Sequence, residues 1–401
     1  MNSDVKMRTN CGILSSSYEI QSVCMRPQDL LLAPELTAAE VDEFLRSYGF
    51  KDPGAADRNL QLMAEDFVQR ELLARIIAGL LNAVRLSPDP DAAFNNFERF
   101  LAVVTHPANF LGFLGDTPEA LEALVLLFGT SPFSAEILIR NPENFYWLLD
   151  HLGATWIRSS ESTMQEARQW IGKFLDSESK FHALSRFKRR EMLRIGARDI
   201  LRIADVVGTV TELSNLADVV IQLVYEICYA KLVGRYGIPC YRNREGSMRP
   251  ARFTVLGMGK LGGRELNYSS DIDLIYLYDG EQGNTQPPIM AAEAETSGGT
   301  QDLENIHPQE DSTIPTSEIT NPEFFKRLAQ STTHELSDLT EEGYFYRVDL
   351  RLRPEGSAGS VATSLTACKN YYSSWGETFE RLSLTKARPV AGSKELGEEF
   401  C

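Results

Sequence analysis

Apolar residues recur at three- and four-residue spacing through most of the first half of the chain. The segments TAAEVDEFLRSYGF and LQLMAEDFVQRELLARIIAGLLNAV both show this pattern, which is typical of amphipathic helices. A further helix of the same kind is predicted from Glu212 to Val233. We therefore expect a helical bundle over residues 37–235, preceded by a polar tail at residues 1–36.

The period changes to that of strands at Ala251. The segments ARFTVLGMG, DIDLIYLYD and GYFYRVDLRLRP are rich in β-branched and aromatic residues, which favour strands. They predict a mixed sheet within a second domain at residues 236–401, with further helix after Thr366. The fold class expected from these patterns is α+β.

An acidic segment separates two of these strands. Residues 281–320 hold eight acidic residues and no Lys or Arg, which is half of the net charge of −16. The segment is also poor in aliphatic and aromatic residues. It is predicted to be a disordered insertion.

Charge and cysteine content exclude several classes of function. A net charge of −16 opposes a sequence-independent grip on nucleic acid. The six cysteines form no CxxC pair, so neither a disulfide scaffold nor a zinc site is indicated. No signal peptide and no apolar run of about 20 residues is present. We expect a cytoplasmic protein without a membrane segment.

A glycine pattern after the first strand has two interpretations. Gly257, Gly259 and Gly262 spell GxGxxG, and Asp279 closes the next strand where a dinucleotide-binding fold holds its ribose. Only about two helical turns fit between Gly262 and Asp271, however, which is too short for the crossover helix of a parallel βαβ unit. This interpretation also leaves the nearby carboxylates without a role.

The second interpretation is a metal site for phosphoryl chemistry. Asp271 and Asp273 lie two apart on one strand, so both leave the same face of the sheet. Two such acids are suited to hold a pair of hard cations. We expect Gly262 and Gly263 to open a short helix whose N–H groups bind phosphate, with hydroxyl donors from Ser269 and Ser270.

The last strand supplies a third acid. Strict alternation along YFYRVDLRLRP puts Arg347, Asp349, Arg351 and Arg353 on one face, and Pro354 is expected to end the strand. On its own, an Asp among arginines is more simply a structural salt bridge. Together with Asp271 and Asp273 it becomes the third metal ligand, and the arginines become phosphate clamps with Lys386 as a further candidate.

The basic segment KRREMLRIGARDILR, residues 188–202, also has two interpretations. It could form a basic face for phosphate or for an acidic partner. A charge-rich helix is more often a solvent-exposed face, which we favour here.

These motifs together resemble a known family. The phrases GMGKLGGRELNYSSDIDLIY, RVDLRLRPEGSAG, YYSSWGETFERLSLTKARPVAG and RFKRREMLRIGARDIL are similar to those of glutamine synthetase adenylyltransferase, also called the adenylyl-removing enzyme. The resemblance runs from about residue 40 to the end. It implies a polymerase-β-like nucleotidyltransferase domain in which Asp271, Asp273 and Asp349 hold magnesium, with two ions expected.

The family carries two such domains in tandem, and this chain resembles the amino-terminal half. The resemblance implies deadenylylation, in which inorganic phosphate attacks tyrosyl-AMP on glutamine synthetase and releases ADP, under control of the regulatory PII protein. Two alternatives stay open. The same site could attach AMP from ATP, or the chain could be a non-catalytic docking module.

Overall fold

The structure is a computed structural model that describes residues 25–33, 35–153, 157–287, 317–340 and 342–401. Most of the predicted polar tail, and residues 288–316 of the predicted insertion, lie outside these ranges. The chain divides into two compact units, one ending at Val125 and the other beginning at Leu126. Each unit is described by itself below.

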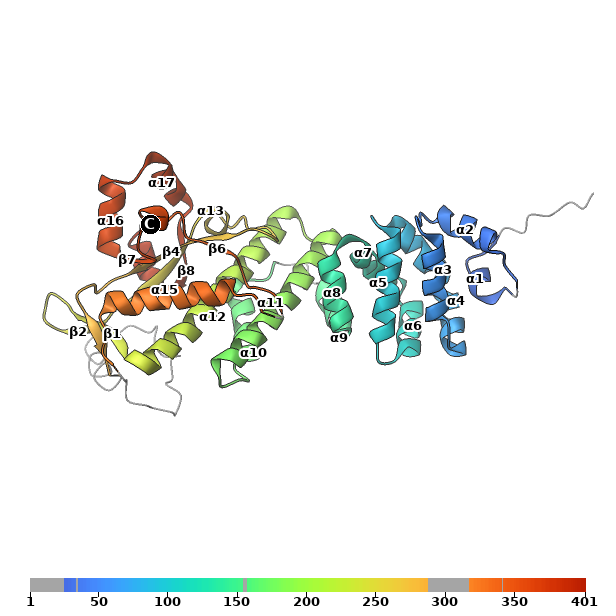
Figure 1. The fold of residues 1–401 in the computed structure, drawn as a ribbon, viewed down its shortest axis with the longest axis horizontal. Coiled ribbons are helices and arrows are strands. Elements are labelled where there is room, and N and C mark those ends of the chain that lie inside the picture. The colour runs from blue at the N-terminus through green and yellow to red at the C-terminus, as the bar shows by residue number, and fades with distance from the viewer. Residues whose placement is uncertain (1–24, 34, 154–156, 288–316, 341) are drawn as a thin grey trace, which may run out of the picture. The chain divides into compact units, whose positions relative to one another are not determined.

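The first unit is entirely helical within its described residues (Figure 1). Its helices are α1 (Asp29–Leu32), α2 (Ala38–Ser47), α3 (Pro53–Met63), α4 (Phe67–Leu86), α5 (Pro90–Val103), α6 (Pro107–Asp116) and the start of α7 (Pro118–Thr130). Several begin at a capping side chain followed by proline, as at Asp52 and Asp89, whose carboxylates accept backbone N–H groups of the first turn.

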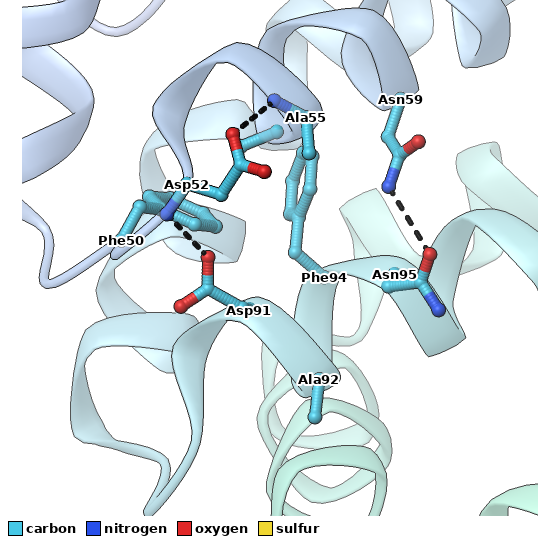
Figure 2. A pocket seen from close by; sticks show the side chains of 9 residues that line it. Phe50, Asp52, Ala55, Asn59, Asp91, Ala92, Phe94 and Asn95 are labelled. Carbon is cyan, nitrogen blue, oxygen red and sulfur yellow. Dashed lines mark hydrogen bonds between the residues drawn. The ribbon is translucent and has the colours of Figure 1, made fainter.

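A hollow lies between α3 and α5 of this unit (Figure 2). Its floor includes Phe94, and its rim carries Asp52 and Asp91. Asp91 accepts the backbone N–H groups of Lys51 and Asp52 at 3.0 Å, and Asp52 accepts that of Ala55 at 2.9 Å. These carboxylates hold helix ends together, so their role is structural.

The second unit begins with helices and continues into the sheets. Its helices are the end of α7, then α8 (Pro132–Arg140), α9 (Glu143–Leu152), α10 (Ser160–Ile171), α11 (Ser177–Ile200), α12 (Val206–Tyr236), α13 (Gly259–Gly262), α15 (Asn321–Ser337), α16 (Leu365–Ser374), α17 (Thr378–Ser383) and α18 (Lys394–Glu398). Helix α12 packs against α10 and α11 on one side and against α15 and the sheet on the other. The helices before residue 235 and the sheet after it therefore share one unit, although the sequence suggests a domain boundary there.

The main sheet has the order β6-β4-β3-β8, and β7 also pairs with β4. Its strands are β3 (Phe253–Gly257), β4 (Ile272–Tyr278), β6 (Val348–Asp349), β7 (Ala362–Ser364) and β8 (Arg388–Gly392). A second sheet has the order β2-β1-β5, formed by β1 (Ile238–Arg242), β2 (Met248–Pro250) and β5 (Asn284–Gln286). Parallel and antiparallel pairs occur together in the main sheet, which confirms the predicted mixed sheet and the α+β class.

The two faces of β4 contact different cores. Ile272 and Leu274 belong to the large core formed with α12 and α15, whereas Ile275 and Leu277 pack in a smaller core with Cys368 of α16. Alternation along the strand places Asp273 on the same face as Ile275. The sequence-based separation of Asp273 from Ile272 and Leu274 is thus confirmed, whereas Asp271, expected on the same strand, lies just before β4 begins.

The dinucleotide-binding interpretation is wrong, because it requires β3 and β4 to run parallel. Strands β3 and β4 are antiparallel, and α13 between them has only four residues. Asp279, which that interpretation assigned to a ribose, instead binds Arg252 through a 2.7 Å ion pair. A parallel βαβ unit requires a crossover that this hairpin does not contain.

Hydrogen bonds hold the two ends of the acidic segment together. Thr285 donates its N–H to the carbonyl of Ile319 at 2.9 Å, and Ile319 donates back to the Thr285 hydroxyl at 3.0 Å. Asn321 adds a backbone bond to the carbonyl of Gly283 at 2.8 Å. The described residues on the two sides of residues 288–316 are therefore held next to each other.

Candidate active site

The pairing of β4 with β6 brings two acids from distant parts of the sequence side by side. The strands run parallel, with Ile272 opposite Val348 and Asp273 opposite Asp349. Ile272 donates its N–H to the carbonyl of Arg347 at 2.9 Å, which fixes this register. Neighbouring side chains on one face of a sheet lie about 5 Å apart at the Cβ atoms. The predicted association of Asp273 with Asp349 is therefore present in the structure.

The turn after β3 is shaped around Asp273. Gly259 has a φ of +53°, and a Cβ on it would stand 2.5 Å from the Asp273 carboxylate oxygen Oδ2. The N–H of Met258 also binds the carbonyl of Asp273 at 2.8 Å. Only glycine leaves room for this carboxylate beside the backbone while adopting that φ at little cost.

Asp271 and Asp349 are each paired with an arginine from the β6 segment. Arg347 Nε donates to Asp271 Oδ1 at 2.6 Å and its Nη2 donates to the carbonyl of Ser269 at 3.2 Å. Arg351 binds the Asp349 carboxylate through Nε at 2.8 Å and through its own backbone N–H at 2.8 Å. These contacts are the salt bridges of the alternative interpretation, so phosphate binding by Arg347 and Arg351 stays a prediction.

Electrostatic interactions among the carboxylates and arginines shift the pKa values of two of the acids. Burial raises the pKa of Asp273 above its ordinary value, and the nearby charges of Asp349 and Asp271 raise it further. Hydrogen bonds from Arg351 instead lower the pKa of Asp349. Negative charge is therefore concentrated around Asp273, which favours binding of a cation at this point.

The three acids supply the kind of oxygen ligand that magnesium prefers. Within the described part of the chain, no group of three or more acidic, His or Cys side chains is already arranged to hold an ion. Two of the three carboxylates, those of Asp271 and Asp349, instead form ion pairs with Arg347 and Arg351. Oxygen ligands on neighbouring strands and the repulsion felt by Asp273 nevertheless fit a hard divalent cation. Arg351 is 81% exposed, so it is free to turn away.

The role expected for Gly262 and Gly263 in opening a helix is wrong. Helix α13 begins at Gly259 and ends at Gly262, and the N–H groups of Gly262 and Gly263 bind the carbonyls of Met258 and Gly259. A Cβ on Gly262 would lie 2.0 Å from the carbonyl oxygen of Lys386. Gly262 is therefore required for close backbone packing, and phosphate binding by this pair stays a prediction without a free N–H in support.

The expected long strand around Asp349 is also wrong, because β6 ends at Asp349. The chain then turns, and Arg353 donates to the carbonyls of Leu350 at 2.9 Å and Gly359 at 3.2 Å. Leu352 packs in the smaller core while Leu350 packs against the larger one, so strict alternation is lost. The Arg353 side chain thus binds carbonyl groups of its own loop, and its charge helps to lower the pKa of Asp349.

The remaining predicted site residues are Ser269, Ser270 and Lys386, which lie near the segment that follows α13. Ser270 donates its hydroxyl to Asn267 Oδ1 at 2.5 Å, and the exposed Ser269 contributes its carbonyl to Arg347. Lys386 forms a 2.7 Å ion pair with Glu265 at the far end of α13. Lys386 is therefore not brought to the three acids.

Two positively charged residues near α13, Arg388 and Lys260, were not predicted from the sequence. Arg388 binds both oxygens of Asp218 at 2.8 Å and the carbonyl of Leu261 at 2.9 Å, which fastens the end of α13 to α12. Lys260 lies in α13 itself, with its ammonium 3.5 Å from the Ser270 hydroxyl. The sequence signal that could have identified Lys260 is its position between the glycines of GMGKLGG, in the segment that precedes the acid pair.

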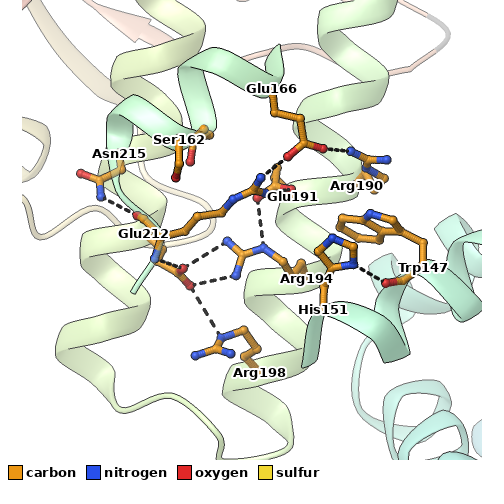
Figure 3. Close-up of polar contacts among 12 residues, drawn as sticks. Trp147, His151, Ser162, Glu166, Arg190, Glu191, Arg194, Arg198, Glu212 and Asn215 are labelled. Atoms are coloured by element: carbon orange, nitrogen blue, oxygen red, sulfur yellow. Dashed lines mark hydrogen bonds and ion pairs between the residues drawn. The ribbon is translucent and has the colours of Figure 1, made fainter. Parts of the chain in front are cut away.

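The basic segment at residues 188–202 proves to be largely buried, so the interpretation as a solvent-exposed face is wrong (Figure 3). Arg194 binds Glu191 at 3.0 Å and Glu212 of α12 at 3.2 Å, and all three side chains are buried. Arg198 lies 3.9 Å from the same Glu212. Buried charges are tolerated because opposite charges surround them.

This buried network extends to the loop that carries the acids. Asn215 of α12 donates to the carbonyl of Arg158 at 3.2 Å and accepts a bond from Arg264 at 2.9 Å. Arg158 in turn pairs with Glu191 at 2.8 Å. The segment between α13 and β4 is thus tied to the interior of the helices.

Helix α11 also holds the segment that leads into β6. Lys188 donates to the carbonyl of Phe345 at 2.6 Å and lies 4.6 Å from the centre of the Tyr346 ring. Arg189 forms a 3.1 Å ion pair with Glu342. Contacts from α11 and α12 therefore position both strands that carry the acids.

No single helix among the described residues is long and apolar enough to span a membrane. Helices α7 and α8 reach that length and composition only together, across a sharp bend.

Comparison with known proteins gives a consistent result. The family model for glutamate-ammonia ligase adenylyltransferase matches residues 121–299 and 301–401. The bifunctional glutamine synthetase adenylyltransferase/adenylyl-removing enzyme of Thioalkalivibrio sulfidiphilus is 31% identical over 350 residues, which is 86% of this chain and 33% of that protein. The protein of the same name from Shewanella loihica is 34% identical over 284 residues, which is 71% of this chain and 26% of that protein.

The chain spans about a third of the length of these relatives. The family model nevertheless covers well over half of the chain, including α13, β4 and β6 with the three acids. The resemblance read from the sequence motifs is confirmed, and the chain belongs to the glutamate-ammonia ligase adenylyltransferase family.

Proposed function

We propose that this chain removes adenylyl groups from a tyrosine of glutamine synthetase by phosphorolysis, which yields ADP and the unmodified tyrosine. The observation that carries the proposal is the direct pairing of Asp273 with Asp349, next to Asp271. Three carboxylates gathered at one edge of a sheet suit phosphoryl-group chemistry. The family supports this substrate, because the matched relatives are named for both transfer and removal of adenylyl groups.

Asp271, Asp273 and Asp349 would hold magnesium in the working enzyme. When bound, two magnesium ions would neutralise charge on the attacking and leaving oxygens of the α-phosphoryl group. Arg347 and Arg351 would then bind phosphate oxygens of the substrate. Arg347 and Arg351 carry forked donors that match phosphate oxygens, and both are largely exposed beside the acids.

The reaction proposed is an in-line displacement. An oxygen of hydrogen phosphate forms a bond to the α-phosphorus, the bond from that phosphorus to the tyrosine oxygen breaks, and the phosphate proton ends on the tyrosine. The same arrangement serves the reverse reaction and attack by tyrosine on ATP, because one site stabilises one kind of transition state. The order of halves in the family favours removal here, with the regulatory PII protein as a proposed partner.

The direct test mixes the purified chain with adenylylated glutamine synthetase, magnesium and inorganic phosphate, and measures ADP release. Phosphate-dependent ADP is the expected result. Incorporation of AMP from ATP, without ADP release, would mean that the direction is wrong. Neither activity, together with binding to glutamine synthetase, would replace the catalytic proposal with a docking role.

A further inference from the structure

Most cations near the three acids already have partners. Arg347 pairs with Asp271, Arg351 with Asp349, Lys386 with Glu265 and Arg388 with Asp218, and Arg353 binds carbonyl groups of its own loop. Each of these side chains therefore already uses part of its positive charge or donor capacity on a protein group.

Lys260 differs from all of them. Within the residues that the structure describes, its ammonium makes no ion pair with a carboxylate, and its one polar contact is the 3.5 Å approach to the Ser270 hydroxyl. The side chain is exposed on α13. An ammonium on a flexible stem can move to a new anion without breaking an existing ion pair.

The position of Lys260 places that charge beside the acids. The residue before it, Gly259, lies against the Asp273 carboxylate, and Ser270 is the immediate neighbour of Asp271. Hydrogen phosphate and the tyrosyl nucleotide are both anions, and three carboxylates repel them. A positive side chain at this edge reduces the repulsion.

We propose that Lys260 is a catalytic residue that binds phosphoryl oxygen at the reacting centre. The inference rests on the proposed function, in which an oxygen of hydrogen phosphate displaces the tyrosine oxygen from the α-phosphorus. The Lys260 ammonium donates hydrogen bonds either to the attacking phosphate or to the α-phosphoryl oxygens. It takes no proton from either group and keeps its charge throughout.

The test compares the wild-type chain with Lys260→Met and Lys260→Arg. Lys394→Met is the matched control, because Lys394 is an exposed lysine on α18 that pairs with the nearby Glu398. The readouts are kcat and KM for phosphate in ADP release, the affinity for ADP by calorimetry, and the melting temperature. Lys260→Met should melt like the wild type, since the side chain is exposed.

We expect Lys260→Met to lose about 10- to 100-fold in kcat/KM, as for the loss of a hydrogen bond to a charged group. A raised KM for phosphate assigns Lys260 to the attacking phosphate, and a lower kcat at saturating phosphate assigns it to the α-phosphoryl group. Lys260→Arg should retain a large part of the activity. A kcat/KM within twofold of the wild type, or an equal loss in Lys394→Met, would overturn the proposal.

The affinity for ADP separates this inference from the proposed function. If the wild-type chain releases no ADP, the phosphorolysis proposal fails and binding of ADP becomes the deciding measurement. Several-fold weaker binding by Lys260→Met would then support the phosphoryl contact, and unchanged binding would reject it.

Discussion

Asp273 and Asp349 lie opposite each other in the parallel pairing of β4 with β6, and the charge of Asp349 contributes to the raised pKa of Asp273. Such a pair of like charges is unfavourable without a cation nearby. The strands hold the two carboxylates together in spite of this repulsion, which indicates that the arrangement serves binding or catalysis more than stability.

Replacing Asp273 with Asn should abolish turnover and leave the fold intact, because one repelling charge and one magnesium ligand are removed together. Magnesium should raise the melting temperature of the wild-type chain but not that of Asp273→Asn, since a ligand stabilises only the state that binds it. Asp271→Asn should also inactivate the enzyme. Activity of either variant within a few-fold of the wild type would disprove the metal assignment.

Replacing Arg351 with Met should strengthen magnesium binding several-fold, because Arg351 competes with the ion for the Asp349 carboxylate. Calorimetric titration with magnesium measures this. Arg327→Met is the matched control, because Arg327 pairs with Glu323 on an exposed face of α15. Weaker magnesium binding by Arg351→Met would instead show that Arg351 holds Asp349 in its binding position.

A methyl group at Gly262 should destabilise the second unit. Its Cβ would meet the carbonyl oxygens of Lys386 at 2.0 Å and Gly257 at 2.6 Å, and both belong to the backbone. We expect Gly262→Ala to lower the free energy of unfolding by about 1–3 kcal/mol, as for other overpacked sites. Denaturant titration measures this change.

Gly234→Ala provides the control for the same substitution. Gly234 lies within α12 and a Cβ there meets no atom within 4 Å, so alanine should stabilise by about 0.5–1 kcal/mol. A loss of stability in both variants would mean that the close contact at Gly262 is not the cause.

The stability of the second unit should depend on Lys188 at alkaline pH. Burial and, to a smaller extent, the charge of Arg189 together lower the pKa of Lys188 to about 8. The unfolded chain, with a lysine pKa of about 10.4, then binds more protons between these two pH values. The free energy of unfolding should therefore rise with pH from about 8 to about 10, by up to about 3 kcal/mol from this group.

Denaturant titrations at pH 7.5 and 9.5 test this expectation. Lys188→Met should reduce the difference between the two pH values, whereas replacement of Lys326, an exposed lysine on α15, should leave it unchanged. An unchanged pH dependence in Lys188→Met would show that Lys188 is not the responsible group.

Local patterns in the sequence identify the strands and the acids well. The alternation around Asp271 and Asp273 predicts both the strand and the face on which Asp273 lies, because one side of β4 must enter the large core. The pairing of Asp273 with Asp349 agrees with the expectation that a neighbouring strand supplies a third acid to the proposed metal site. Antiparallel pairing of β3 with β4 likewise agrees with the short loop between them.

Features that depend on which partner a side chain or turn finds in the folded chain could not be predicted in this way. The early end of β6 depends on Arg353 finding carbonyl groups of its own loop. The position of α13 depends on the fit of Gly259 against Asp273. The burial of Arg194 depends on Glu212, which lies on another helix. Charge patterns do not distinguish a buried ion network from an exposed face.

The pinned ends of the acidic segment have a consequence for the evolution and engineering of this protein. Bonds between Thr285 and Ile319 close the segment at its base, so its length has little bearing on the position of β6. In general, each doubling of the length of a loop adds only about 0.6 kcal/mol of closure entropy. This segment is therefore a place where natural insertions can accumulate, and where a reporter domain could be introduced while Asp273 and Asp349 stay in register.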